Sequence, residues 1–295
     1  MSAYMNSRRL KKMLPGSVRR YLGGVKHRLR TSPLYTRWRK AKLLSANSLD
    51  PAQRAFLTKT GSRISSEDAM LFVRAVGQYF KAGLSAISCI DEALQQAGNT
   101  TVNEILDMPS GYGRVLRLLA SRFPKARITA CDVIPDAIRF CAETFGATPA
   151  HSSSNFDELS FSTKFDLIWC GSLVTHLDAD RTRALFRFFA KYLRAEGLLV
   201  LTTHGDHVPT IFDGNNNFGV NSAEVPQLLK AFHEQGYGYD DDPAGYGYPG
   251  YGFSLTARTW MIAEALEVGL KEVYFCAHGW DNFQDVFGFV KTSSI

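Results

Sequence analysis

Two aspartates and two glycines are spaced as a bound nucleoside requires. An apolar run ends at Asp107, a turn containing Gly111 and Gly113 follows, and a second apolar run ends at Asp132, about twenty residues later. A carboxylate at the tip of a second strand accepts both hydroxyls of a ribose, and glycines let the backbone approach a ligand at the start of a helix. The pattern predicts a site for a nucleoside-bearing cofactor.

The residues of the turn indicate which cofactor this is. The dinucleotide fingerprint requires a third glycine, and position 116 here holds Leu116. Asp107, directly before the turn, suits a positively charged ligand group better than a pyrophosphate. S-adenosylmethionine carries an ammonium and a sulfonium, so we expect S-adenosylmethionine at this turn.

Four segments in this order resemble the motifs of class I S-adenosylmethionine-dependent methyltransferases. They cover about residues 101 to 205 and comprise the turn, the strand ending at Asp132, residues 164–177 and residues 193–203. Pro109 departs from the family, which usually has a glycine two residues after the first acid. Proline has no N–H and a fixed φ, so this position cannot donate to a ligand or take a left-handed geometry.

A narrower set of bacterial methyltransferases, often found with the glycosyltransferases of surface-polysaccharide assembly, shares further motifs with this chain. They are Trp169–Leu177, Thr202–Gly205, Tyr251–Leu255 with Trp260, and Gly279–Val286. Phe283 stands where that set usually has a histidine. The resemblance implies a role in polysaccharide biosynthesis, with O-methylation of a sugar hydroxyl on a glycan or lipid-linked saccharide, or of a similar small hydroxylated metabolite.

The cofactor site is expected to have four parts. The turn cradles the methionine end, the second acid binds the ribose, the segment after a short strand near 148–152 contacts the adenine, and the end of the next strand forms the floor. The predicted contacts are Asp107, Pro109, Ser110, Gly111, Gly113, Asp132, Val133, Ser153, Asn155, Phe156, Cys170, Gly171 and Ser172. The alternative role for the two aspartates is as helix N-cap or turn acids.

Methyl transfer to a hydroxyl needs orientation and a base. Ligands of an open parallel sheet bind beyond the carboxyl ends of its strands, which selects His176 and His204 as catalytic candidates. Each has the alternative of serving only as a hydrogen-bonding residue. The predicted acceptor-binding residues are Tyr251, Ser254, Trp260, Trp280, Asp281 and Gln284, with His278 beside them.

The surrounding pattern alternates strands and helices. We expect strands near 103–107, 127–132, 148–152, 165–170 and 197–203, and helices near 113–122, 135–145 and 180–194. Residues 272–278 and 285–291 predict a closing antiparallel hairpin. The expected fold is α/β: a Rossmann-like, doubly wound, seven-stranded sheet, mostly parallel with an antiparallel C-terminal hairpin strand, and helices on both faces.

The remaining segments frame this core. Residues 66–97 predict helices with Ser66 as an N-cap, and further helices are expected over 223–235 and 254–265. The Gly- and Tyr-rich stretch 236–253 predicts a loop, either a lid over the acceptor or a surface connector. We expect an N-terminal extension over 1–60 and a methyltransferase domain over 61–295, with its cofactor core at 101–205, an acceptor-side insertion at 206–262 and a hairpin at 268–292.

The positive charge belongs to the N-terminal part. Thirteen of the 34 Lys and Arg residues lie between Arg8 and Lys42, no acid precedes Asp50, and the rest of the chain has a net charge of about −7. Apolar residues from Leu10 to Leu29 recur at helical spacing, so residues 8–42 suit an anionic membrane surface. The alternatives are a disordered arm, a helix docked on its own domain, a transit peptide, or nucleic-acid binding, which the lack of a binding module disfavours.

Composition limits the other classes of function. The five cysteines are scattered without a C-x-x-C pair, which predicts reduced thiols and no metal site. No transmembrane run or secretory signal is apparent, so we expect a cytoplasmic protein, peripheral at the inner face of the membrane if the tail binds there. No particular oligomeric state follows. The alternative functions are a nucleic-acid methyltransferase and a non-catalytic S-adenosylmethionine-binding scaffold.

Overall fold

The computed structural model describes residues 31–46, 49–73, 76–98, 101–212, 218–241 and 250–292. The chain divides between Phe80 and Lys81 into two compact units, which are described separately. The predicted amphipathic pattern over residues 10–29 lies outside the described residues. Of the basic segment 8–42, only residues 31–42 are described.

The described residues of the first unit form three helices and the start of a fourth. They are α3 (Pro33–Leu44), α4 (Pro51–Lys59), α5 (Met70–Val73) and α6 (Val76–Ala97), which continues into the second unit. Ser32 caps α3 by accepting a hydrogen bond from the Tyr35 amide, and Asp50 begins α4 with a capping box. The Lys40 ammonium donates to the Thr60 carbonyl just after the end of α4, which ties these two helices together.

Ser66 is not the N-cap that the sequence predicts. Helix begins only at Met70, whose amide donates to Asp68 Oδ1 over 3.0 Å. The other oxygen of Asp68 accepts from the Tyr79 hydroxyl over 2.7 Å. A carboxylate that also has a buried phenolic partner holds this start more firmly than an exposed serine could, because hydrogen bonds to charged groups are the stronger ones.

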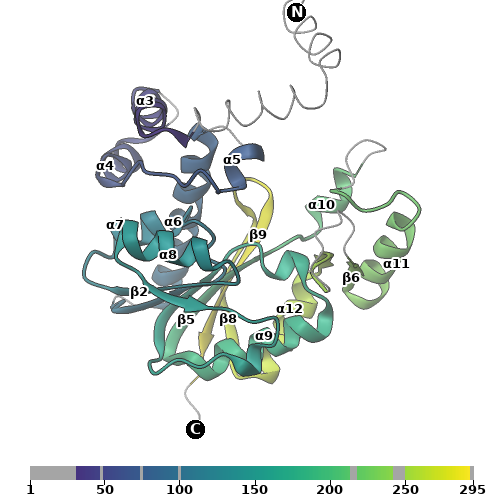
Figure 1. Ribbon diagram of the computed structural model, residues 1–295. Coiled ribbons are helices and arrows are strands. Elements are labelled where there is room, and N and C mark those ends of the chain that lie inside the picture. The colour runs from purple at the N-terminus through teal and green to yellow at the C-terminus, as the bar shows by residue number, and fades with distance from the viewer. Residues whose placement is uncertain are drawn as a thin grey trace, which may run out of the picture. The chain divides into compact units, whose positions relative to one another are not determined.

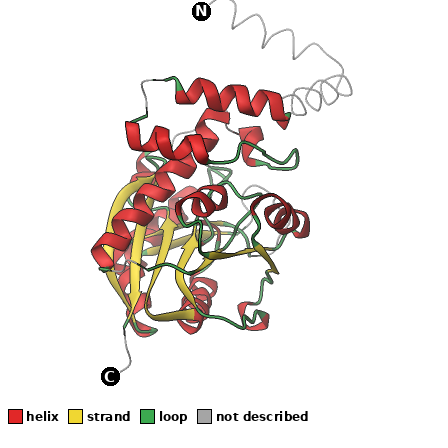
Figure 2. Cartoon of the chain, turned by 90° about the vertical axis from the view of Figure 1, so that its left-hand side faces the viewer, coloured by secondary structure: helices red, strands yellow, loops and turns green. Residues whose placement is uncertain are grey.

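The second unit is built on a seven-stranded sheet with the order β3-β2-β1-β4-β5-β9-β8 (Figures 1 and 2). Neighbours from β3 to β5 are parallel, and β9 runs antiparallel to both β5 and β8. The strands are β1 (Glu104–Asp107), β2 (Arg127–Asp132), β3 (Thr148–His151), β4 (Phe165–Cys170), β5 (Leu193–Thr203), β8 (Leu270–Trp280) and β9 (Gln284–Lys291). The predicted doubly wound sheet with its antiparallel hairpin is confirmed.

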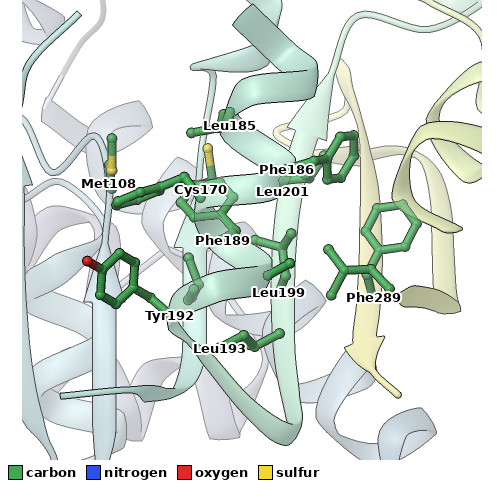
Figure 3. Close-up of a cluster of buried hydrophobic side chains, with 14 of the residues drawn as sticks. Met108, Cys170, Leu185, Phe186, Phe189, Tyr192, Leu193, Leu199, Leu201 and Phe289 are labelled. Carbon is green, nitrogen blue, oxygen red and sulfur yellow. The ribbon is translucent and has the colours of Figure 1, made fainter. Parts of the chain in front are cut away.

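Helices cover both faces of this sheet. In Figure 1, α7 and α8 lie on one side, and α9 and α12 lie on the other. Their bounds are α7 (Leu116–Arg122), α8 (Pro135–Phe145), α9 (Ala179–Tyr192) and α12 (Arg258–Glu267). Figure 3 shows Phe186 and Phe189 of α9 with Leu199 and Leu201 of β5, and Phe289 of β9, in one buried cluster. Because the sheet is covered on both sides, its central strands are buried along almost their whole length.

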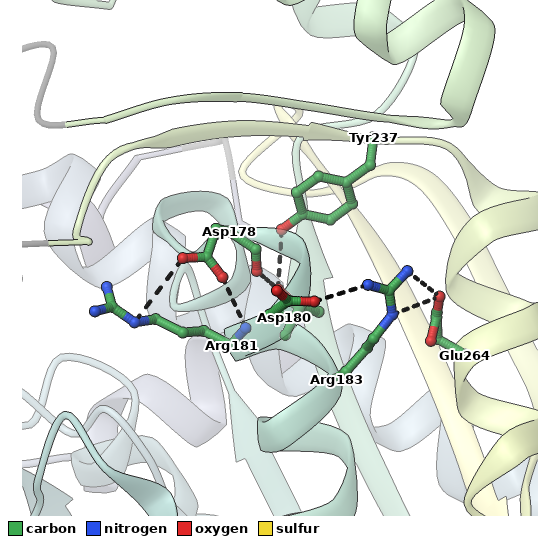
Figure 4. Close-up of polar contacts among 7 residues, drawn as sticks. Asp178, Asp180, Arg181, Arg183, Tyr237 and Glu264 are labelled. Carbon is green, nitrogen blue, oxygen red and sulfur yellow. Dashed lines mark hydrogen bonds and ion pairs between the residues drawn. The ribbon is translucent and has the colours of Figure 1, made fainter.

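A second sheet pairs β6 (Tyr237–Asp240) with β7 (Phe253–Thr256) in antiparallel fashion. The prediction of a loop over 236–253 is therefore wrong for its first residues, and the helix expected from Ser254 begins only at Arg258. Tyr237 anchors the strand: its hydroxyl donates to the Leu177 carbonyl over 2.8 Å and lies 2.9 Å from Thr182 Oγ1, above the start of α9 (Figure 4). These contacts are distant in sequence, so local composition does not show them.

Helix α11 (Val225–Gln235) packs against this small sheet, and the short helix α10 (His207–Thr210) leads toward it from β5. The apolar cluster beneath consists of Val208, Val220, Leu228, Phe232, Phe253 and Leu255. Two 3-10 turns, Phe156–Glu158 and Val174–His176, follow β3 and β4. Among the described helices, none combines the length and apolar character needed to span a membrane.

We expect Tyr237→Phe to lower the free energy of unfolding by about 1–2 kcal/mol, because it leaves the buried Leu177 carbonyl without its donor. Chemical denaturation followed by circular dichroism measures this change. Tyr239→Phe is the matched control, since its hydroxyl bonds at the surface to Asp241. Equal effects of the two variants would show that Tyr237 does not anchor β6.

Candidate functional site at the carboxyl ends of the parallel strands

The turn after β1 brings Asp107 and Asp132 to one end of the sheet. The amide of Ser110 donates to the Cys131 carbonyl over 3.0 Å, which holds the turn beside β2. The peptide bond between Met108 and Pro109 is cis.

The two glycines of this turn have different roles. Both have positive φ, +48° at Gly111 and +75° at Gly113, which disfavours any other residue. A Cβ at Gly113 would lie 2.8 Å from the Phe145 ring and 3.2 Å from the Cys141 sulfur, so this glycine lets α8 pack against the turn. A Cβ at Gly111 would meet nothing within 4 Å, so the open side of the turn lies there.

Asp107 is a buried carboxylate whose oxygens accept no hydrogen bond from the described residues. It is 1% exposed. Burial, followed by the negative charge of Asp132, raises its pKa well above the usual value, and Arg114 acts against this shift. Native proteins rarely leave such a group unpaired, because burial without a partner costs free energy. The arrangement suits a cationic group at this position.

Asp132 is held by the turn itself. Its Oδ2 accepts from the Gly111 amide over 2.7 Å, and its Oδ1 accepts from the Ile134 amide over 3.0 Å. Burial raises its pKa, and these amides lower it. Each oxygen has a second lone pair, so the carboxylate can still accept the two hydroxyls of a ribose. Val133 and Ile134 beside it are 49% and 41% exposed and provide an apolar surface.

The three residues predicted to contact adenine lie after β3. Ser153 donates to Glu158 over 2.7 Å, and Asn155 caps the 3-10 turn by accepting from the Asp157 amide over 3.1 Å. Phe156 is 7% exposed, and its ring packs near Phe188 of α9. These contacts define the conformation of the segment. They place the Phe156 ring in the core, so its contact with adenine stays a prediction.

The floor residues join the ends of three strands. The Ser172 amide donates to Thr202 Oγ1 over 2.8 Å, and the Thr202 hydroxyl donates to Gln284 Oε1 over 2.6 Å. Gln284 also donates to Ser172 Oγ over 2.9 Å. Thus β4, β5 and β9 are linked through one network of side chains. Gln284, predicted to bind the acceptor, is part of this network and is 8% exposed.

The other two floor residues are closely packed. Cys170 is fully buried, and burial raises the pKa of its thiol. A Cβ at Gly171 would lie about 3 Å from the rings of Trp169 and Trp280, so only glycine fits between them.

Both catalytic candidates, His176 and His204, contact the segment 251–256, which contains the strand β7. His176 Nδ1 lies 2.8 Å from the Gly252 carbonyl, and its own carbonyl accepts from the Gly252 amide over 2.8 Å. His204 Nδ1 lies 3.2 Å from the Ser254 carbonyl, and its carbonyl accepts from the Thr256 amide. The two histidines therefore fix the sheet of β6 and β7 to the ends of β4 and β5.

These contacts also assign the tautomers. A carbonyl only accepts, so in both rings Nδ1 carries the proton and Nε2 carries the lone pair. Burial, together with the nearby His176, lowers the pKa of His204 to about 3, and burial lowers that of His176. His204 is 5% exposed and enclosed by Phe253 and Phe283, whereas His176 is partly exposed and stacks on Tyr251 at 4.2 Å.

The predicted acceptor residues fall into two groups. Tyr251 and Ser254 form the first group and contact His176 and His204, respectively. Ser254 is fully buried, and its hydroxyl donates to the Val174 carbonyl over 2.6 Å. Trp260 instead packs against Tyr237 and lies below the Arg183 guanidinium.

The hairpin residues lie against α6. The Trp280 indole is 4% exposed and donates to the Ala82 carbonyl over 2.8 Å, and the Asp281 amide donates to Ser85 Oγ over 2.9 Å. Their contact with an acceptor stays a prediction.

The sequence did not predict that Asp285, His278 and His207 lie together. Asp285, 6% exposed, accepts from the His278 amide over 2.9 Å, and the His278 ring lies 4.2 Å from that of His207. Burial raises the pKa of Asp285, while both histidine rings lower it. The sequence signals were His278, named beside the acceptor residues, and the motif Gly279–Val286, which contains Asp285. Within the described part of the chain, no group of three or more His, Cys, Asp or Glu residues is arranged to hold a metal ion.

A hollow of about 620 Å³ lies elsewhere. It runs along the edge strand β3, whose residues Thr148–His151 all line it, and it also contacts Glu104 and Arg127 at the starts of β1 and β2 and residues 158–163. Ligands of such sheets bind beyond the carboxyl ends of the strands at the point where the strand order reverses, which here lies between β1 and β4. The site described above is therefore the better candidate.

Comparison with known proteins finds similarity over part of the chain. Residues 105–197 match a methyltransferase-domain family. A malonyl-[acyl-carrier protein] O-methyltransferase of Acetivibrio thermocellus is 28% identical over 103 residues, which are 35% of this chain and 36% of that protein. Its counterpart from Laribacter hongkongensis is 27% identical over 112 residues, 34% and 37% of the two chains. The chain thus spans little more than a third of the length of the curated relatives it matches.

Solved structures share the fold. Streptomyces venezuelae DesVI has a TM-score of 0.52 at 15% identity, covering 77% of this chain and 98% of that chain. An S-adenosylmethionine-dependent methyltransferase from Clostridium acetobutylicum has a TM-score of 0.50 at 15% identity, covering 72% and 92%. The chain therefore has the Rossmann-like fold of these proteins and resembles the methyltransferase-domain family over residues 105–197.

Gly113→Ala should lower the free energy of unfolding by about 2–4 kcal/mol, because the added Cβ adds overpacking against Phe145 to the cost of a positive φ. Gly111→Ala carries only the conformational cost, about 1 kcal/mol. Chemical denaturation of both variants measures the difference. If Gly111→Ala were the more destabilising, the packing role of Gly113 would be wrong.

Proposed function

We propose that the chain is an S-adenosylmethionine-dependent methyltransferase that methylates an oxygen atom. The observation that carries this is the buried Asp107 carboxylate, unpartnered among the described residues, beside a glycine turn whose amide holds Asp132. This geometry provides an anionic position for an ammonium next to an acceptor for ribose hydroxyls. The family match over residues 105–197 supports it.

Different residues of the site bind different parts of S-adenosylmethionine. Asp107 faces the ammonium of the methionine part, Asp132 accepts the ribose hydroxyls, and the exposed Val133 packs against the adenine. When bound, S-adenosylmethionine supplies a methyl group on a sulfonium, already activated for displacement. The protein then has to orient the acceptor in line with that methyl group and receive the acceptor's proton.

Of the two histidines, we assign proton acceptance to His176 and a positioning role to His204. His176 is partly exposed, and its Nδ1–H bond to the Gly252 carbonyl aims the basic Nε2 away from that strand. His204 is enclosed by aromatic rings, and a pKa of about 3 makes it a weak base. Its hydrogen bond to the Ser254 carbonyl instead holds β7 in register with His176.

The acceptor is a sugar hydroxyl in this proposal, on a glycan or lipid-linked saccharide. Support comes from the sequence motifs shared with methyltransferases of polysaccharide assembly. The names of the relatives, both O-methyltransferases, support oxygen as the atom methylated. Residues 8–42 would hold the protein at the cytoplasmic face of an anionic membrane, where lipid-linked saccharides are found.

Calorimetric titration of the full chain with S-adenosylmethionine and S-adenosylhomocysteine tests the cofactor assignment. Binding of neither would contradict it. Labelled methyl transfer to a panel of nucleotide sugars, glycolipids, malonyl-acyl-carrier protein and RNA then tests the acceptor. Transfer to RNA, or binding without transfer to any member, would overturn the sugar proposal in favour of a nucleic-acid enzyme or a scaffold.

Asp107→Asn should stabilise the free protein and weaken its binding of S-adenosylmethionine. The folded-state pKa of Asp107 is raised, so the wild type loses stability as pH rises from about 4 through that raised pKa. The variant lacks this loss, so its advantage grows with pH and reaches about 1–3 kcal/mol at neutral pH. Thermal denaturation from pH 4 to 8, with and without S-adenosylmethionine, measures both effects. A variant destabilised at every pH would show that the carboxylate has a structural partner.

His176→Ala should reduce turnover by roughly 10²- to 10⁴-fold with little change in cofactor affinity. In the wild type, kcat/KM should rise with pH through the lowered pKa of His176, so this limb lies below pH 6.5. The limb should vanish in the variant, and the exposed His233→Ala serves as the control. A limb that persists in His176→Ala would assign the proton to another group.

A further inference from the structure

One face of α3 has an unusual composition. Its exposed residues recur at helical spacing and are Pro33, Leu34, Arg37, Trp38, Ala41, Lys42 and, at the C-cap, Ser45. Leu34 is 80% exposed and Trp38 is 55% exposed. The opposite face is buried through Thr36 and Leu43, so α3 has a definite inner side. Two large apolar side chains thus project from the outer side of a packed helix.

Cations surround these apolar groups. Helix α3 contains no acid, and Arg37, Arg39 and Lys42 lie on or beside this face, whereas Lys40 is buried and donates to the Thr60 carbonyl. The Arg39 guanidinium and the Lys42 ammonium each lie 5.8 Å from the centre of the Trp38 ring. The Tyr35 ring lies at the same distance from that of Trp38. An aromatic pair flanked by basic side chains is typical of protein surfaces at the headgroup level of a membrane.

We propose that this face of α3 binds an anionic lipid bilayer. Leu34 and Trp38 enter the boundary between headgroups and acyl chains, and Arg37, Arg39 and Lys42 lie at the level of the lipid phosphates. An anionic bilayer offers an apolar layer beneath a negative surface, so it satisfies both kinds of side chain. Because the proposal rests on α3 alone, lipid binding and methyl transfer can each fail without the other.

Partition of the full chain between buffer and vesicles tests this proposal. We expect binding to vesicles of phosphatidylcholine with phosphatidylglycerol and little binding to phosphatidylcholine alone. Trp38→Ala should weaken the partition roughly tenfold. Neutralising Arg37 and Lys42 to Gln should weaken it by about fivefold for each charge.

Matched controls test whether removing any exposed apolar or basic side chain has the same effect on vesicle binding. Leu266→Ala removes an exposed apolar side chain of α12, and Lys125→Gln with Lys271→Gln removes two exposed charges elsewhere. Circular dichroism confirms that each variant is folded. If the α3 variants bound vesicles as the controls do, the proposal would be overturned.

Fluorescence quenching by brominated phosphatidylcholine locates the inserted ring. The other tryptophans are Trp169, Trp260 and Trp280, all in the second unit. We expect quenching in anionic vesicles that is lost in Trp38→Phe, which still binds. Quenching that persists in Trp38→Phe would overturn the proposal. The proposal would also be overturned if RNA bound over Trp38, or if self-association without lipid buried it.

Discussion

The two carboxylates at the ends of β1 and β2 are the constraint around which the site is built. Their strands are parallel neighbours, so their ends lie at one edge of the sheet, and each negative charge raises the cost of the other. Asp132 is compensated by two backbone amides, one of them from Gly111, whereas Asp107 has no partner among the described residues. In the proposed function, the satisfied acid binds the ribose hydroxyls through its remaining lone pairs, and the other acid receives the cationic group of the ligand.

The small sheet of β6 and β7 is attached to this edge by histidines. Through their rings and their carbonyls, His176 and His204 bond the segment from Gly252 to Thr256, and Tyr237 adds a bond from β6 to the Leu177 carbonyl. A histidine bonded through Nδ1 keeps Nε2 basic, so holding the strand and accepting a proton do not exclude each other. The two histidines do differ in basicity, because burial among aromatic rings removes most of the basicity of His204.

The sequence predicted those elements whose determinants are local. Strands 127–132 and 165–170 and the helix over 135–145 have the predicted bounds, because each is an apolar or amphipathic run between clear breakers. Strand β6 escaped prediction because Tyr237 gains its stability from Leu177 and Thr182, far along the chain. The acids and glycines of the turn follow from a known spacing. The approach of Asp285 to His278 follows from the predicted hairpin, but that of His207 depends on the pairing of β9 with β5, which no local pattern contains.

Proton release on binding S-adenosylmethionine tests the central claim most directly. Calorimetric titrations near pH 5 in buffers of different ionisation enthalpy give the number of protons exchanged. If Asp107 receives the ammonium, the wild type releases protons as its raised pKa falls, and Asp107→Asn releases fewer. Binding without proton release, with equal affinity for an analogue lacking the ammonium, would contradict the account.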